Sequence, residues 1–168
     1  MMSKIFIHGL ESSGRGFKGQ YFKKIFPDIL TPDFTPFSEQ ISISDLLEIR
    51  MKELEMLLNE SSELIIIGSS FGGLMATLYA FRYPEKIKLL ILLAPFLSPK
   101  FLNLKKNNEI RIPTIIFHGK NDNVCPVEET KRIARKIFPN LTYNIVDDDH
   151  YLRKTVQSIN WVSLIHSH

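Results

Sequence analysis

Apolar positions along the chain alternate between short continuous runs and stretches with helical spacing. The continuous runs predict strands that are covered on both faces, as in a parallel sheet. Six strands are expected, at residues 4–8, 28–30, 64–67, 87–93, 113–118 and 141–146. The widest apolar stripe at helical spacing runs from Leu46 to Leu58 and includes Arg50. This alternation predicts an α/β fold, a three-layer α/β/α sandwich with helices on both faces of a mainly parallel sheet.

Composition limits the classes of function. The 168 residues fit one domain, spanning residues 1–168. The net charge of +3 is too small to favour nucleic acid, and we expect no nucleic-acid partner. The single cysteine, Cys125, excludes an intrachain disulfide, and no Cys/His spacing of a metal site is present. No apolar run is long enough to span a bilayer and no signal peptide is visible, so we expect a cytoplasmic protein.

One motif carries a specific chemistry. Residues 68–72 read Gly-Ser-Ser-Phe-Gly, a Gly-x-Ser-x-Gly pattern between the apolar run Leu64–Ile67 and a helical stretch that starts at Leu74. A strand that turns sharply into a helix at this pattern holds its serine at the apex of a strained turn, which is the nucleophile elbow of serine hydrolases. Ser70 is therefore the candidate nucleophile. The alternative is an ordinary strand-to-helix turn built from Gly and Ser.

A serine hydroxyl needs a base to take its proton and an acid to orient that base. Sites of open α/β sheets lie at the carboxyl ends of the strands, and His150 follows the last expected strand. Asp122 follows the preceding strand and is the candidate acid, which gives the chain order Ser, Asp, His. The alternative acids are Asp147, Asp148 and Asp149. His8 and His118 also end strands, and we expect them to be structural because His150 has the better position.

The reaction also needs donors for the oxyanion of the transition state. One should be the backbone N–H after the nucleophile, on Phe71. The other should come from the turn after the first strand, Ile7-His8-Gly9-Leu10, where the Leu10 N–H is the candidate. The predicted activity is hydrolysis of a carboxylic ester or thioester through an acyl-enzyme, with neither metal nor cofactor.

Taken together, these motifs resemble the α/β-hydrolase family over essentially the whole chain. The resemblance rests on His8-Gly9, on Gly68–Gly72, on Gly119 with Asp122 followed by Pro126, and on the late His150. In size and layout the chain is similar to small lidless bacterial esterases of the YqiA-like group, which implies a serine esterase or thioesterase. Since the pattern begins at the His-Gly strand, we expect the family's leading strands to be absent and a six-stranded sheet in the order 2-1-3-4-5-6.

The resemblance also allows a prediction about the lid domain that many family members carry over their active site. Family members insert their lid after the strand that here ends near Ala94, where this chain offers only Pro95–Arg111. That segment is too short for a cap of several helices, so we expect a minimal fold without a lid domain and an open site. Phe96 and Leu97 are candidate walls of a pocket for the acyl group, and core packing would account for them equally well.

Other functions remain open at this point. Residues 14–19 read Gly-x-Gly-x-x-Gly and open a helix, with Asp33 further on, a pattern that occurs in dinucleotide-binding folds. Its first glycine lies several residues past the strand instead of in the tight turn, which weakens this alternative. A non-catalytic binding module on a hydrolase scaffold is the other alternative. The sequence leaves the acyl chain, the leaving group, the physiological substrate and the oligomeric state undetermined.

Overall fold

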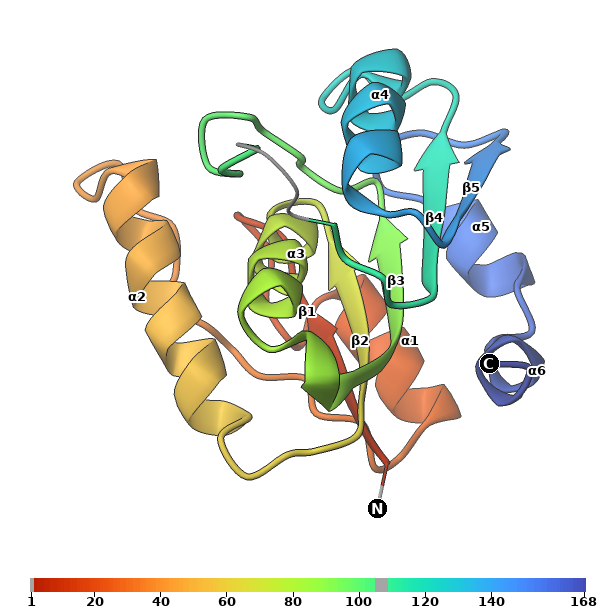
Figure 1. Cartoon of the computed structure of the whole chain (residues 1–168), viewed down its shortest axis with the longest axis horizontal. Helices are drawn as coiled ribbons and strands as arrows, with labels where there is room; N and C mark the ends of the chain where they lie inside the picture. The colour runs from red at the N-terminus through yellow and green to blue at the C-terminus, as the bar shows by residue number, and fades with distance from the viewer. Residues whose placement is uncertain (1, 105–108) are drawn as a thin grey trace.

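A parallel sheet lies at the centre of the molecule (Figure 1). The computed structural model describes residues 2–104 and 109–168. In these residues the sheet has five strands, β1 (Ser3–Ile7), β2 (Leu64–Ser69), β3 (Ile87–Leu93), β4 (Thr114–Gly119) and β5 (Leu141–Val146). The strands lie side by side in chain order, and every pair is parallel. The predicted α/β fold class is therefore confirmed.

The prediction of a sixth strand at residues 28–30 is wrong. Only Leu30 of that segment pairs, as an isolated parallel bridge with Ile5 beside β1. Its carbonyl accepts from the Phe6 N–H at 2.8 Å, and its N–H donates to the Lys4 carbonyl at 2.9 Å. The chain then reaches Pro32, which has no N–H for a strand ladder, so pairing ends after one residue. The bridge lies where the order 2-1-3-4-5-6 expects the second strand.

Helices cover both faces of the sheet. They are α1 (Phe17–Ile25), α2 (Ile43–Leu57), α3 (Phe71–Arg82), α4 (Val127–Ile137), α5 (Arg153–Ser158) and α6 (Trp161–His166), and a short 3₁₀ turn at Pro84–Lys86 precedes β3. In Figure 1, α3 lies in front of the sheet and α1 lies behind it. None of the helices in the described residues is both long and apolar enough to cross a membrane.

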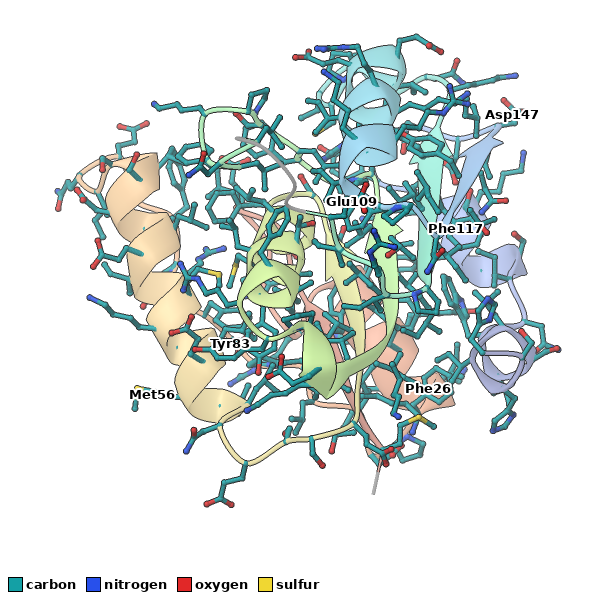
Figure 2. All side chains as sticks on the ribbon, viewed as in Figure 1. Phe26, Met56, Tyr83, Glu109, Phe117 and Asp147 are labelled. Atoms are coloured by element: carbon teal, nitrogen blue, oxygen red, sulfur yellow. The ribbon has the colours of Figure 1, made fainter. Side chains whose placement is uncertain are left out.

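The alternation of side chains along a strand divides the core into two clusters. On β2, Ile65 and Ile67 pack with residues of α1, α5 and α6, whereas Leu64 and Ile66 pack with residues of α2, α3 and α4. The outer side of α2 remains in solvent, and Figure 2 shows Met56 pointing away from the sheet there, with 80% of its surface exposed. The continuous apolar runs in the sequence are thus strands buried on both faces.

The connection between β3 and β4 is where a lid would be inserted. Its described residues form no helix between Ala94 and Thr114. Residues 105–108, which belong to the segment Pro95–Arg111 used for the prediction, lie outside the described residues. The described part of this connection includes Phe96, whose N–H donates to the Ser70 carbonyl at 3.0 Å. It therefore packs against the turn after β2.

Candidate active site

Ser70 occupies the turn between β2 and α3 with an unusual backbone conformation. Its φ is 53° and its ψ is −116°, outside the regions that residues with a side chain usually adopt. The Ser70 N–H donates to the Leu93 carbonyl at 3.0 Å, and the Ser70 carbonyl accepts from the N–H groups of Phe96 at 3.0 Å and Gly73 at 2.9 Å. These bonds come from β3, from the connection after it and from α3. They hold the strained residue in place.

The glycines of the motif let α3 approach the sheet. A Cβ on Gly72 would lie 2.1 Å from the Ile7 carbonyl oxygen and 2.6 Å from that of His8. A Cβ on Gly68 would lie 2.6 Å from the Gly72 carbonyl oxygen. The first turn of α3 is therefore in direct contact with the end of β1. This contact brings the turn after β1 next to Ser70.

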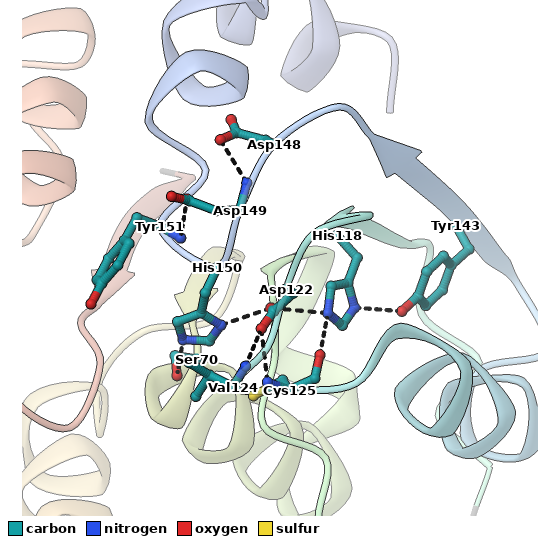
Figure 3. Close-up of polar contacts among 10 residues, drawn as sticks. All are labelled: Ser70, His118, Asp122, Val124, Cys125, Tyr143, Asp148, Asp149, His150 and Tyr151. Carbon is teal, nitrogen blue, oxygen red and sulfur yellow. Dashed lines mark hydrogen bonds and ion pairs between the residues drawn. The ribbon is translucent and has the colours of Figure 1, made fainter.

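The structure brings the three predicted side chains into one hydrogen-bonded row (Figure 3). His150 Nε2 lies 3.0 Å from Ser70 Oγ, and His150 Nδ1 lies 2.7 Å from Asp122 Oδ2. Ser70 follows β2, Asp122 follows β4 and His150 follows β5, so all three lie at the carboxyl ends of strands. The side chain of Asp122 is fully buried, while 12% of that of His150 is exposed.

Hydrogen bonds keep the Asp122 carboxylate ionised. Burial alone would raise its pKa, but the Cys125 N–H, His150 and the Val124 N–H donate to the carboxylate and hold the pKa below its usual value. The two backbone donors each lie 2.8 Å from Oδ1. An ionised Asp122 accepts a hydrogen bond from the His150 Nδ1–H group, so the unprotonated Nε2 is left to accept a hydrogen bond from the Ser70 hydroxyl.

The alternative acids have other partners. Asp147 forms an ion pair with Lys120 at 2.8 Å. Asp148 accepts from the N–H and the hydroxyl of Thr155, both at 2.8 Å, and so joins the loop to α5. Asp149 accepts from the Tyr151 N–H at 2.8 Å. In the structure, Asp122 is the carboxylate that contacts the His150 ring.

A second histidine contacts the same carboxylate. His118 Nε2 lies 3.1 Å from Asp122 Oδ2 and 2.8 Å from the Cys125 carbonyl, so this nitrogen carries a proton that both acceptors share. Its Nδ1 accepts from the Tyr143 hydroxyl at 2.6 Å. Burial lowers the pKa of His118, which keeps the ring neutral. The sequence predicted only a structural role for His118, and its contact with Asp122 was not predicted.

The two residues predicted to carry the oxyanion donors lie in the cavity wall together with Ser70. Phe71 is the first residue of α3, so its N–H has no acceptor within the helix. Leu10 follows the turn after β1, and both residues line the same cavity as Ser70 and His150. In the described residues, neither N–H donates to another backbone group. Both amides are thus available to a ligand in the cavity.

Arg50 contacts both residues that carry these donors. The residue lies on the buried face of α2, has no exposed surface, and donates to the carbonyls of Leu10 at 2.9 Å, Gly9 at 3.3 Å and Thr35 at 2.7 Å. Its guanidinium also lies 5.6 Å from the centre of the Phe71 ring. Burial lowers the pKa of Arg50, but a guanidinium stays charged at neutral pH. An arginine within an apolar stripe was the sequence signal for this role.

A cavity of about 640 Å³ opens beside Ser70. Its apolar walls include Leu10, Phe17, Ile43, Phe96, Val124 and Tyr151. Of the two predicted pocket residues, Phe96 lines the cavity, whereas Leu97 is 95% buried within the core and is absent from the wall. The position of Leu97 differs from the prediction because its side chain points to the packed face of the sheet.

Two remaining groups near the site have structural explanations. Cys125 lies beside Ser70, but burial raises the pKa of its thiol to about 12, which keeps it protonated. Asp33, the acid of the alternative dinucleotide pattern, accepts from the Gly14 N–H at 2.8 Å and pairs with Arg15 at 3.1 Å. Across residues 2–104 and 109–168, no group of three or more His, Cys, Asp or Glu side chains is arranged to hold a metal ion.

Comparison with known proteins gives one family match and many similar structures. The family model described as serine aminopeptidase, S33, matches residues 39–104. A mouse (lyso)-N-acylphosphatidylethanolamine lipase is 44% identical over 50 residues, which are 30% of this chain and 14% of the length of that protein. Mouse alpha/beta hydrolase domain-containing protein 10 has a TM-score of 0.80 at 17% identity and covers 98% of this chain and 90% of its own.

A serine hydrolase from the bacterium Cycloclasticus zankles is similar as well, with a TM-score of 0.75 at 16% identity over 99% of this chain and 90% of its own. The chain has the α/β-hydrolase fold. Its sheet order, its elbow at Ser70 and its strand-end histidine all have counterparts in the general plan of this fold. The similar proteins support a hydrolase and do not single out the YqiA-like group.

The buried histidines of this α/β-hydrolase fold predict a pH dependence of stability. Burial lowers the pKa of His8 and of His118 below 6.5, their ordinary value. As the pH falls below 6.5, the unfolded chain binds protons that the folded chain does not, so the free energy of unfolding should fall. Urea unfolding at a series of pH values measures this dependence. The variant His118→Gln should show a shallower slope, and His166→Gln, at an exposed position, should retain the original one. A slope unchanged in His118→Gln would contradict the prediction.

Proposed function

We propose that the protein is a serine hydrolase that cleaves a carboxylic ester or thioester. The observation that carries the proposal is the row of hydrogen bonds from Ser70 through His150 to Asp122, at 3.0 and 2.7 Å. A hydroxyl, an imidazole and a buried carboxylate in this geometry have the arrangement of a nucleophile, its base and the group that orients the base. The strained elbow under Ser70 and the adjoining cavity support the same interpretation.

In the proposed reaction, Ser70 Oγ attacks the acyl carbon and His150 Nε2 takes the hydroxyl proton. The carbonyl oxygen becomes an oxyanion that accepts from the Leu10 and Phe71 N–H groups. His150 then gives its proton to the leaving alcohol or thiol, and an ester of Ser70 remains. Water, deprotonated by His150, attacks this acyl-enzyme, and collapse of the second oxyanion releases the carboxylic acid and restores Ser70.

The charges of this α/β-hydrolase are arranged for such chemistry. Asp122 stabilises the imidazolium that His150 becomes after it accepts a proton. Arg50 holds the carbonyls of Gly9 and Leu10, so its charge and its hydrogen bonds orient the turn that carries the Leu10 N–H. We assign Arg50 and His118 as positioning residues, the first for the oxyanion donors and the second for the Asp122 carboxylate.

The cavity walls favour esters over peptides with a free amino terminus. An aminopeptidase substrate carries an ammonium group, which requires carboxylates in the pocket. The carboxylate side chain in the cavity wall is that of the exposed Glu11, whereas two cationic side chains, Lys18 and Arg153, line the same cavity. The apolar walls around Phe96 suit the hydrocarbon part of an acyl group.

Labelling with a fluorophosphonate tests the identity of the nucleophile. The probe should react with the unmodified protein and leave Ser70→Ala unlabelled, as measured by intact mass. Ser69→Ala, which changes the neighbouring hydroxyl, is the matched control and should still be labelled. A folded Ser70→Ala variant that is labelled as fast as the unmodified protein would remove Ser70 from the proposed role. No labelling of any variant would favour the non-catalytic alternative.

Paired substitutions test the identity of the acid. Asp122→Asn removes the charge that orients His150, and we expect kcat to fall on the order of 10³- to 10⁴-fold on a para-nitrophenyl ester. Asp147→Asn removes an exposed carboxylate of the neighbouring loop and should change kcat less than about threefold. Similar losses of kcat in the two variants, with both folded by circular dichroism, would refute the assignment of Asp122.

A further inference from the structure

Two cationic side chains face the cavity that contains Ser70. Lys18 lies in the first turn of α1, and Arg153 is the first residue of α5. Both line the cavity together with Ser70 and His150. The Arg153 guanidinium lies 5.0 Å from the centre of the Phe17 ring, so the start of α5 is in contact with the start of α1. The two cations therefore belong to one side of the cavity.

Neither cation has an anionic partner in the described part of the chain. No ion pair and no hydrogen bond involves the side chain of Lys18 or Arg153 within those residues. The nearby carboxylates of Asp148 and Asp149 accept instead from Thr155 and Tyr151. Lysines outside the cavity differ from Lys18, since Lys120 and Lys154 both pair with Asp147.

The surroundings of Lys18 disfavour its charge. The side chain is half-buried, and burial followed by the charge of Arg153 lowers its pKa to about 8, although Asp149 and Asp148 act in the opposite direction. An unpaired ammonium beside a second cation, in a partly apolar cavity, is stabilised when an anion binds there. The structure thus has two cations in the cavity wall that also contains the proposed nucleophile, and no carboxylate of the described residues forms an ion pair with either of them.

We propose that Lys18 and Arg153 bind an anionic group, a carboxylate or a phosphate, on the ester or thioester that Ser70 cleaves. The inference rests on the proposed function and adds a substrate class to it. The anion lies either on the acyl chain or on the leaving group. The scissile carbonyl sits at Ser70 while the anion contacts the α1 and α5 side of the cavity.

Matched esters locate the anion. For the acyl side, the para-nitrophenyl monoester of adipic acid is compared with para-nitrophenyl hexanoate, which has the same chain length and no charge. For the leaving-group side, the hexanoate ester of para-hydroxybenzoic acid is compared with that of para-hydroxybenzamide. To test whether the anion is a phosphate, hexanoyl-coenzyme A is compared with hexanoyl-pantetheine, which lacks the phosphate groups. We expect kcat/KM to be about tenfold higher for the charged member of at least one pair.

Substitution of Lys18 and Arg153 then tests whether these two side chains cause the preference for a charged ester. Lys18→Met and Arg153→Met should each bring the ratio of kcat/KM for the preferred pair towards one, and Lys24→Met, an exposed lysine of the same helix, should leave the ratio unchanged. The ratio should also fall as the pH rises through about 8, where Lys18 loses its charge beside Arg153, Asp148, Asp149 and Glu11. No preference for any charged ester, or a preference retained in Lys18→Met, would overturn the inference.

A binding measurement separates this inference from the proposed function. If no ester is hydrolysed in a manner that depends on Ser70, the proposed function fails and the anion site is judged by calorimetry. Hexanoate should then bind the unmodified protein more tightly than the uncharged hexanamide, and Lys18→Met should remove the difference. Equal binding of hexanoate and hexanamide to the unmodified protein would overturn the anion site on its own.

Discussion

The positive φ of Ser70 is the constraint on which the rest of the site depends. A serine in this conformation costs on the order of 1–3 kcal/mol, and the surrounding backbone has to maintain it. Hydrogen bonds from Phe96 and to Leu93 supply that support from β3 and its connection. The close contact of Gly72 with the end of β1 supplies the rest, because it brings the turn at Leu10 beside the start of α3. One strained residue thus joins three segments that are distant in the sequence.

Buried charges then determine the direction of each hydrogen bond. The ionised Asp122 receives bonds from two backbone amides and two histidines, and this fixes which nitrogen of His150 faces Ser70. In the turn after β1, Arg50 donates to the carbonyls of Gly9 and Leu10. The Leu10 N–H takes no part in these bonds and stays available to a ligand in the cavity. Both charged groups are buried and hydrogen-bonded, which is the condition under which a buried charge can be tolerated. The anion site proposed at Lys18 differs because its ammonium has no such partner among the described residues.

The sequence predicted those features that depend on local pattern and chain order. Apolar runs located the five strands, and the central ones, β2 and β3, are almost continuously buried because a parallel strand inside the sheet is covered on both faces. Ser70, Asp122 and His150 could be chosen because side chains that follow parallel strands meet at one edge of the sheet, and they do lie together. The strand at 28–30 was overpredicted, since a short apolar run does not reveal that Pro32 ends the pairing after Leu30. Arg50, His118 and Lys18 could not be assigned, because their partners come from segments whose approach only the folded chain defines.

In the proposed reaction Ser70 of the strained elbow attacks the acyl carbon, His150 takes the serine proton, and two backbone amides stabilise the developing oxyanion. A crystal structure of the protein after reaction with a fluorophosphonate tests it most directly, since the phosphonyl oxygen takes the place of that oxyanion. We expect phosphorus bonded to Ser70 Oγ, with the phosphonyl oxygen within about 3 Å of both the Leu10 and the Phe71 nitrogen atoms. A phosphonyl oxygen directed away from these amides, or phosphorus bonded to another residue, would contradict it.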